Sequence, residues 1–235
     1  MFRVNISSGI IDARGVVQES YPDMDGFSSD DFVQAFSDLR GRDVTIVLNS
    51  QGGVVSEGLS IFNQIEAHDG VVTVVIDAVA ASIASVIAMA ADRIVMRRKA
   101  QIFVHDPWTI AMGNASGFRT VADHLDMLGR EIAEVYSERA TLNGKNGAID
   151  YWLALMKEET WFTAEQALES GLAEEISTRE MRESIDDSDE SENREQQQEE
   201  ESKILEPVAR LTSTRILAEV LDKRHRVMRE RLGIR

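Results

Sequence analysis

One stretch, residues 77–91 (DAVAASIASVIAMAA), restricts the fold of this chain more than any other. The run at residues 71–76, apolar except for Thr73, leads directly into it, and such a run is typical of a buried parallel strand. The small residues 78–81 follow, where we expect a turn, and an apolar helix begins after Ser82. A buried strand that passes through a tight turn into a buried helix indicates an α/β fold.

Ser82 stands where this strand meets the helix. The free N–H groups and the positive dipole end of the helix would surround its hydroxyl and would stabilise a developing oxyanion. Serine is also a favoured helix N-cap, so the stretch alone leaves two interpretations open, cap and nucleophile. Ser85 is a weaker candidate nucleophile, because a hydroxyl one turn inside a helix bonds back to a carbonyl.

The rest of the chain alternates strands and helices. Around the Ser82 stretch we expect strands over residues 10–17, 44–48, 93–96 and 102–104, and helices over residues 31–39 and 56–68. This order predicts a parallel sheet with right-handed crossover helices. Later helices are expected over residues 117–140, 148–156 and 163–170. The first of these has an apolar stripe and a charged opposite face, so we expect a projecting helix that packs on another surface.

The composition excludes several function classes. The formal net charge of −16 argues against nucleic-acid binding, which needs a basic surface. The absence of cysteine excludes disulfides, cysteine nucleophiles and thiolate metal sites, and is typical of a reducing compartment. We find no signal peptide and no apolar run long enough to span a membrane. The sequence therefore predicts a cytoplasmic protein without membrane contact, metal or cofactor.

Three segments are expected along the chain. Residues 1–177 carry the α/β pattern and form the predicted domain. Residues 178–202 are acidic and polar, so they cannot bury enough surface to fold and are predicted to be a disordered linker. Residues 203–235 alternate apolar residues with arginines, which predicts a basic amphipathic helix. That helix would either be solvated beside the acidic linker or bind a partner.

Two further features change the interpretation of Ser82. Gly52 and Gly53 follow a strand, where two glycines either make a plain turn or let the backbone approach a ligand and point an N–H toward it. His105 ends the apolar strand QIFVH, where it is either a buried core histidine or the general base that accepts a proton from a serine. Each feature is weak alone, but the combination is specific for serine catalysis.

Four segments together resemble the Clp protease proteolytic subunit family, and within it the phage-type head-maturation (prohead) proteases. They correspond to the family's N-S-P-G-G turn, A-A-S nucleophile segment, strand-end histidine and F-x-A-x-E-A-x-x-x-G-L closing helix. In this chain they read LNSQGGVVSEGLSIFNQI, AVAASIASVIAMAA, IFVHDPW and ETWFTAEQALESGLAEEI. The resemblance implies a ClpP/crotonase-like fold with a projecting handle helix, homo-oligomeric rings and serine endopeptidase activity inside the ring.

By position, Ser82 matches the family's nucleophile and His105 its general base. The backbone N–H groups of Gly53 and Ile83 match the oxyanion hole. The strip after the glycines would offer a strand edge to an extended polypeptide substrate.

The chain departs from the family pattern at three places. Gln51 replaces the proline of the glycine turn, and Met156 stands six residues before the matching phenylalanine, where the family has its acid. We take Glu159 as the replacement acid because it would lie on the same helical face. Other candidates for this role are Glu158 and Asp150, and a serine–histidine dyad is the alternative. The N-terminus lacks a match to the family's axial loop, so we expect no unfoldase ATPase partner.

The sequence supports three hypotheses about function. The first is a phage head maturation protease that cleaves capsid, scaffold or portal proteins in the host cytoplasm or inside the prohead. The second is a ring-forming scaffold whose active site is vestigial because the acid is lost at Met156. The third, a crotonase-type enzyme on a thioester, is weaker because that chemistry does not need the serine–histidine pair, and fold alone does not decide.

Overall fold

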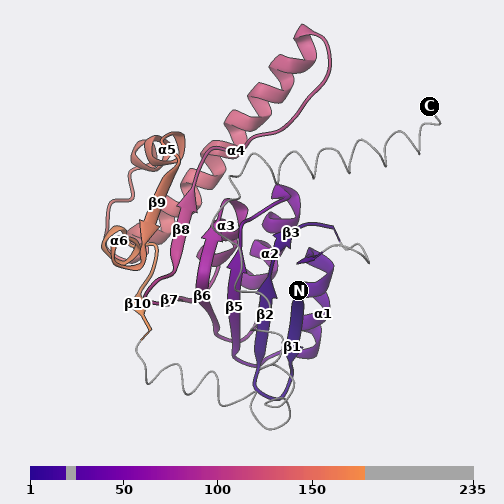
Figure 1. Ribbon diagram of the computed structural model, residues 1–235, viewed down its shortest axis with the longest axis vertical. Helices are drawn as coiled ribbons and strands as arrows, with labels where there is room; N and C mark the ends of the chain where they lie inside the picture. The colour runs from indigo at the N-terminus through magenta and orange to yellow at the C-terminus, as the bar shows by residue number, and fades with distance from the viewer. Residues whose placement is uncertain (20–24, 178–235) are drawn as a thin grey trace, which may run out of the picture. The chain divides into compact units, whose positions relative to one another are not determined.

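The computed structural model describes residues 1–19 and 25–177, and it shows an eight-stranded sheet (Figure 1). Along the main path β1 pairs antiparallel with β2 and every following pair is parallel. The predicted mixed α/β architecture with a parallel sheet is therefore present. The path runs in the order β1 (Phe2–Asn5), β2 (Ile10–Arg14), β5 (Val44–Ser50), β6 (Val72–Ala81), β7 (Arg93–Met96) and β10 (Glu175–Ile176).

The predicted turn over residues 78–81 is wrong, because β6 continues as a strand to Ala81. The edge of β6 that faces away from β5 is shared by two strands. Its first half pairs with β7, and its last residues pair in parallel with β8 (Gln101–Val104). The small alanines thus gain a ladder of hydrogen bonds, a tertiary effect that outweighs their low strand propensity.

β8 also pairs antiparallel with β9 (Thr160–Thr163), a strand that the sequence analysis missed together with β1. The strand expected over residues 10–17 is interrupted at Gly15, which has φ +100°. The chain then forms β3 (Val16–Val17), which pairs with β4 (Gly26–Phe27) in a separate small sheet.

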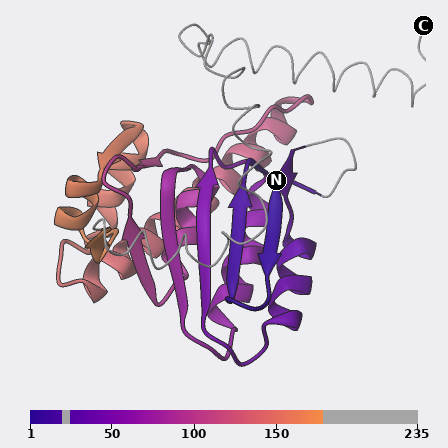
Figure 2. The ribbon, with the colours of Figure 1, turned by 60° about the horizontal axis from the view of Figure 1, so that its bottom comes forward.

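Three helices cross between the parallel strands. They are α1 (Ser29–Asp38), α2 (Val55–Glu66) and α3 (Ile83–Met89). Every residue of α3 is buried, as expected for a helix whose residues are all apolar except Ser85. Ser28 begins α1 with a capping box that it forms with Asp31. In Figure 2 most of the helical mass lies on one side of the sheet.

The remaining helices are α4 (Ala115–Leu142), α5 (Ile149–Lys157) and α6 (Ala164–Ser170), close to the predicted bounds. The 28-residue α4 extends beyond the sheet in Figure 1. Its second half is buried around Ile132 and Tyr136, whereas Phe118 in its first half is 51% exposed. No helix in the described part of the chain is both long and apolar enough to cross a bilayer. The predicted linker and C-terminal helix lie outside the described residues.

Candidate active site

Ser82 has backbone angles that a helix N-cap does not have. Its φ is 56° and its ψ is −133°, whereas a cap residue is extended and accepts a hydrogen bond from the first turn. The Ser82 side chain makes no such cap hydrogen bond. A positive φ in a serine stores strain, and strain of this kind is concentrated at functional sites. A strained turn between a strand and a helix is a geometry that presents a nucleophilic hydroxyl.

Hydrogen bonds hold the Ser82 backbone on both sides. Its N–H donates to the carbonyl of Phe103 on β8 at 2.9 Å. Its own carbonyl accepts from the Ser85 N–H at 2.9 Å and from the Ser85 hydroxyl at 2.6 Å. Ser85 is fully buried, so it does not offer a hydroxyl to a polypeptide substrate.

The structure brings His105 to Ser82. The Nε2 of His105 lies 2.8 Å from the Ser82 Oγ, a hydrogen-bond distance. The pairing of β6 with β8 explains the contact: Ala81 is in register with Phe103, so Ser82 and His105 emerge from the ends of neighbouring parallel strands. The sequence predicted that both residues lie at strand ends, and the shared edge of β6 makes those ends adjacent.

Burial lowers the pKa of His105 below its ordinary value, because desolvation disfavours the imidazolium. The carboxylates of Glu159 and Asp106 act in the opposite direction and raise the pKa of His105. A histidine with a lowered pKa is neutral near physiological pH, and a neutral imidazole can accept a proton from serine.

Aromatic rings support His105 from one side. The ring of Phe103 stacks on that of His105 with centroids 5.1 Å apart, and Trp161 stacks on Phe103 at 4.5 Å. Phe103 on β8 and Trp161 on β9 are directly opposite in the ladder, which places the two rings together. The sequence analysis missed this stack, although the alternation of Phe103 and His105 on one strand places both on the same face.

Two backbone N–H groups near Ser82 have no protein acceptor among the described residues. Val17 bonds to the carbonyl of Gly52 and to the N–H of Val54, so the N–H of Gly53 between them points to the other side of the chain. The second group belongs to Ile83, the first residue of α3, whose N–H has no partner within the helix. Both residues were expected at an oxyanion hole.

Gly52 lets the glycine turn pack directly against Ser82 and Ile83. A Cβ built on Gly52 would lie 2.7 Å from the Ser82 Cβ and 3.2 Å from the Ile83 nitrogen, and Gly52 has φ +89°. Only glycine adopts this conformation freely and fits this space. The strand edge expected after the glycines is short, because α2 begins at Val55.

The structure places the residues that the sequence analysis considered for the acid partner of His105. Met156 is fully buried in α5. The reason given for Glu159 is wrong, because α5 ends at Lys157 and Glu159 has φ +53° outside the helix. Its carboxylate nevertheless raises the pKa of His105, whereas Glu158 and Asp150 are not among the groups that do so. No hydrogen bond joins the side chains of Glu159 and His105, both of which the structure describes.

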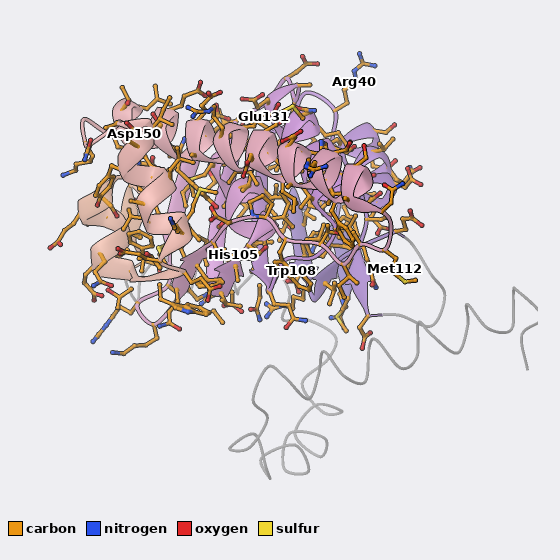
Figure 3. The ribbon with its side chains drawn as sticks, turned by 90° about the horizontal axis from the view of Figure 1, so that it is seen from above. Arg40, His105, Trp108, Met112, Glu131 and Asp150 are labelled. Atoms are coloured by element: carbon orange, nitrogen blue, oxygen red, sulfur yellow. The ribbon has the colours of Figure 1, made fainter. Side chains whose placement is uncertain are left out.

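His105, Trp108 and Met112 follow one another along the loop that runs beside α4 (Figure 3). Trp108 is 57% and Met112 is 97% exposed, so apolar side chains continue outward from the histidine. In the part of the chain that the structure describes, no three histidine or carboxylate residues come together as metal ligands would.

Comparison with known proteins gives a family match. The model of the Clp protease family matches residues 29–180. The chain is 29% identical over 141 residues to the ATP-dependent Clp protease proteolytic subunit 1 of Protochlamydia amoebophila, covering 58% of this chain and 66% of the relative. It is 28% identical to the proteolytic subunit of Bacteroides fragilis over 58% of this chain and 64% of the relative. It is also 30% identical to proteolytic subunit 2 of Thermobifida fusca, over 59% of this chain and 67% of that protein. The aligned region thus spans a little under two thirds of the first two relatives.

Proposed function

This chain belongs to the Clp protease family, and on that basis we propose that it is a serine endopeptidase that cleaves polypeptides through an acyl-enzyme on Ser82. The observation that carries the proposal is the hydrogen bond between His105 Nε2 and the hydroxyl of a strained Ser82, 2.8 Å long. The vestigial scaffold, the alternative from the sequence, is not favoured because this pair is geometrically intact.

The geometry supports acyl transfer in two steps. His105 Nε2 accepts the hydroxyl proton as Ser82 Oγ attacks the peptide carbonyl, and the negative charge develops on the carbonyl oxygen. The N–H groups of Gly53 and Ile83 donate to that oxygen. The imidazolium then protonates the leaving amine, and the C–N bond breaks. In the second step His105 deprotonates a water that hydrolyses the ester, and the proton returns to Ser82.

We assign Glu159 an electrostatic role rather than that of a hydrogen-bonded triad acid. Its carboxylate raises the pKa of His105 and therefore stabilises the imidazolium that forms in the transition state. Asp106 contributes in the same direction. The stack of Phe103 on His105 restrains the ring, a function that a bonded acid performs in other serine enzymes. The site then works as a serine–histidine dyad in the field of a carboxylate.

Narrower proposals concern substrate and assembly. The resemblance to prohead proteases supports capsid, scaffold or portal proteins as substrates, in the host cytoplasm or within the prohead. The family membership supports a homo-oligomeric ring, and the exposed and partly exposed apolar residues in the first half of α4, which include Phe118 and Leu125, are the surface we assign to it. Co-expression with the capsid and scaffold proteins of a candidate phage, followed by detection of their cleavage, tests this substrate class. Cleavage of an unrelated unfolded protein at an equal rate would contradict the narrow substrate class.

Intact mass spectrometry after treatment with a fluorophosphonate tests the proposed activity. We expect one adduct on the wild type, located at Ser82 by peptide mapping, and none on Ser82→Ala. Ser137→Ala serves as the matched control, because it removes a serine hydroxyl that bonds to the carbonyl of Gly147 away from the site. A folded wild type without an adduct, or an adduct on Ser85, would overturn the proposal.

A further inference from the structure

Two hydroxyl groups that the proposed chemistry does not use lie buried beside Ser82. Ser85 on α3 is fully buried and Tyr136 on α4 is 1% exposed. The Ser85 Oγ lies 2.7 Å from the Tyr136 hydroxyl and 2.6 Å from the carbonyl oxygen of Ser82. A third neighbour of the Ser85 Oγ is the carbonyl oxygen of Phe103, at 3.3 Å.

The direction of these hydrogen bonds follows from the donors available. A serine hydroxyl has one proton, and a carbonyl oxygen can only accept. The short contact to the Ser82 carbonyl therefore requires Ser85 to donate there. The Ser85 oxygen is left as the acceptor for Tyr136, so the tyrosine hydroxyl must be the donor. Burial raises the pKa of Tyr136, which keeps its phenol protonated and able to donate.

The acceptor at the end of this chain is part of the proposed oxyanion hole. The Ser82 carbonyl and the Ile83 N–H belong to the same planar peptide unit. A hydrogen bond that fixes the direction of the carbonyl therefore fixes the direction of the N–H on its opposite side. The same unit sets ψ of Ser82 at −133°, outside the usual regions, so its orientation depends on external contacts.

We propose that Tyr136 and Ser85 are positioning residues that lock the Ser82–Ile83 peptide unit, so that the Ile83 N–H points at the developing oxyanion. This inference rests on the proposed function of the site. Tyr136 selects which carbonyl Ser85 binds, because without it the serine hydroxyl can turn between the carbonyls of Ser82 and Phe103. Tyr136 is on α4, so the lock joins this helix directly to the site.

Second-order rate constants of fluorophosphonate labelling measure the effect. Ser85→Ala should be labelled about 10- to 100-fold more slowly than the wild type. Complete loss of an oxyanion donor costs about 10² to 10³ in rate. The expected loss is smaller because the backbone N–H of residue 85 still donates to the Ser82 carbonyl. Tyr136→Phe keeps the ring and should slow labelling about threefold to tenfold, since a small misplacement is costly. The double variant should resemble Ser85→Ala alone, because the tyrosine acts through the serine.

Two readouts separate positioning from a general loss of structure. The midpoint of the pH–rate profile should stay at the wild-type value, since His105 is untouched, and with a peptide substrate kcat should fall while KM stays constant. Ser137→Ala is the control. It removes a different buried serine hydroxyl, on α4, that bonds to the carbonyl of Gly147, and it should be labelled at the wild-type rate.

The outcomes distinguish the two proposals. A wild type that is not labelled contradicts the proposed function itself. Labelling of Ser82 at the wild-type rate in both Ser85→Ala and Tyr136→Phe overturns the lock and leaves the protease proposal in place. Additive losses in the double variant would also overturn it, because they would show that the tyrosine does not act through Ser85.

Discussion

Substitution of Gly52 by alanine tests the packing of the glycine turn against Ser82. The new Cβ would lie 2.6 Å from the carbonyl oxygen of Ala81 and 2.7 Å from the Cβ of Ser82. Real Cβ atoms do not approach other atoms so closely, so the turn or the Ser82 backbone must move. The φ of +89° at position 52 adds backbone strain for any residue other than glycine.

Gly41→Ala provides a control that separates these two costs. Gly41 has φ +71°, but a Cβ there would meet no atom within 4 Å. The free energy of unfolding of Gly41→Ala should therefore fall only by the cost of a left-handed backbone conformation, about 1 to 2 kcal/mol. The free energy of unfolding of Gly52→Ala should fall by that amount and by a further about 1 to 3 kcal/mol, because the new Cβ overpacks the turn. The difference between the two variants isolates the contact with the nucleophile segment.

Urea unfolding and fluorophosphonate labelling measure the two consequences. We expect a larger loss in the free energy of unfolding for Gly52→Ala than for Gly41→Ala. Labelling of Ser82 should fall by about 100-fold or more at position 52, since small displacements of reacting groups are costly, and should be unchanged at position 41. Equal stabilities and equal labelling rates in the two variants would refute the reasoning.

Three further perturbations have outcomes that follow from the site and from α4. Glu159→Gln removes a charge that raises the pKa of His105, so the acid limb of the pH profile of labelling should move to lower pH. The plateau rate of labelling should fall only about 3- to 10-fold, whereas loss of a hydrogen-bonded triad acid costs about 10⁴ in rate. Trp161→Ala removes the outer ring of the stack on Phe103, and labelling should slow up to about tenfold, the equivalent of one aromatic pair. Leu125→Asp places a charge on the partly exposed face of α4, and sedimentation should show a smaller assembly than the wild type.

Each of these has a control and a contrary result. Asp106→Asn should move the same limb in the same direction, and a profile unchanged in both carboxylate variants would contradict the electrostatic role. Trp161→Phe should restore most of the labelling rate, and a slow phenylalanine variant would show that stacking is not the cause. Leu142→Asp changes a leucine that is 78% exposed at the other end of α4 and should assemble normally. A monomeric wild type would end the idea of a ring.

The sequence predicted the alternating elements well because buried parallel strands and helix caps have local signals. Arg93–Met96 matches its predicted bounds, and Thr163 begins α6 with the expected capping box. The course of residues 78–81 could not be predicted, because alanines become a strand only where another strand pairs with them. β9 was missed for a similar reason: its partner β8 is far away in sequence.

The residues of the site were predictable where chemistry shows in the residue type. A serine, a histidine and a glycine pair are conspicuous at strand ends, and the structure places Ser82 and His105 in contact. The supports of the site were not visible. Tyr136 looks like one more core residue of a helix, and its hydrogen bond to Ser85 depends on how α4 packs against α3. The helical-face argument for Glu159 failed because the helix ends two residues earlier.

The antiparallel pairing of β8 with β9 affects when the site around Ser82 can form during synthesis of the chain. Trp161 follows Phe103 by 58 residues, and β10, which completes the sheet edge beside β7, comes later still. A ribosome therefore releases Ser82 and His105 well before the strand that supports them. Non-local pairings of this kind form late in folding. A nascent or truncated chain would thus carry Ser82 without its support, and the proposed activity would arise only once residues up to β10 have been made.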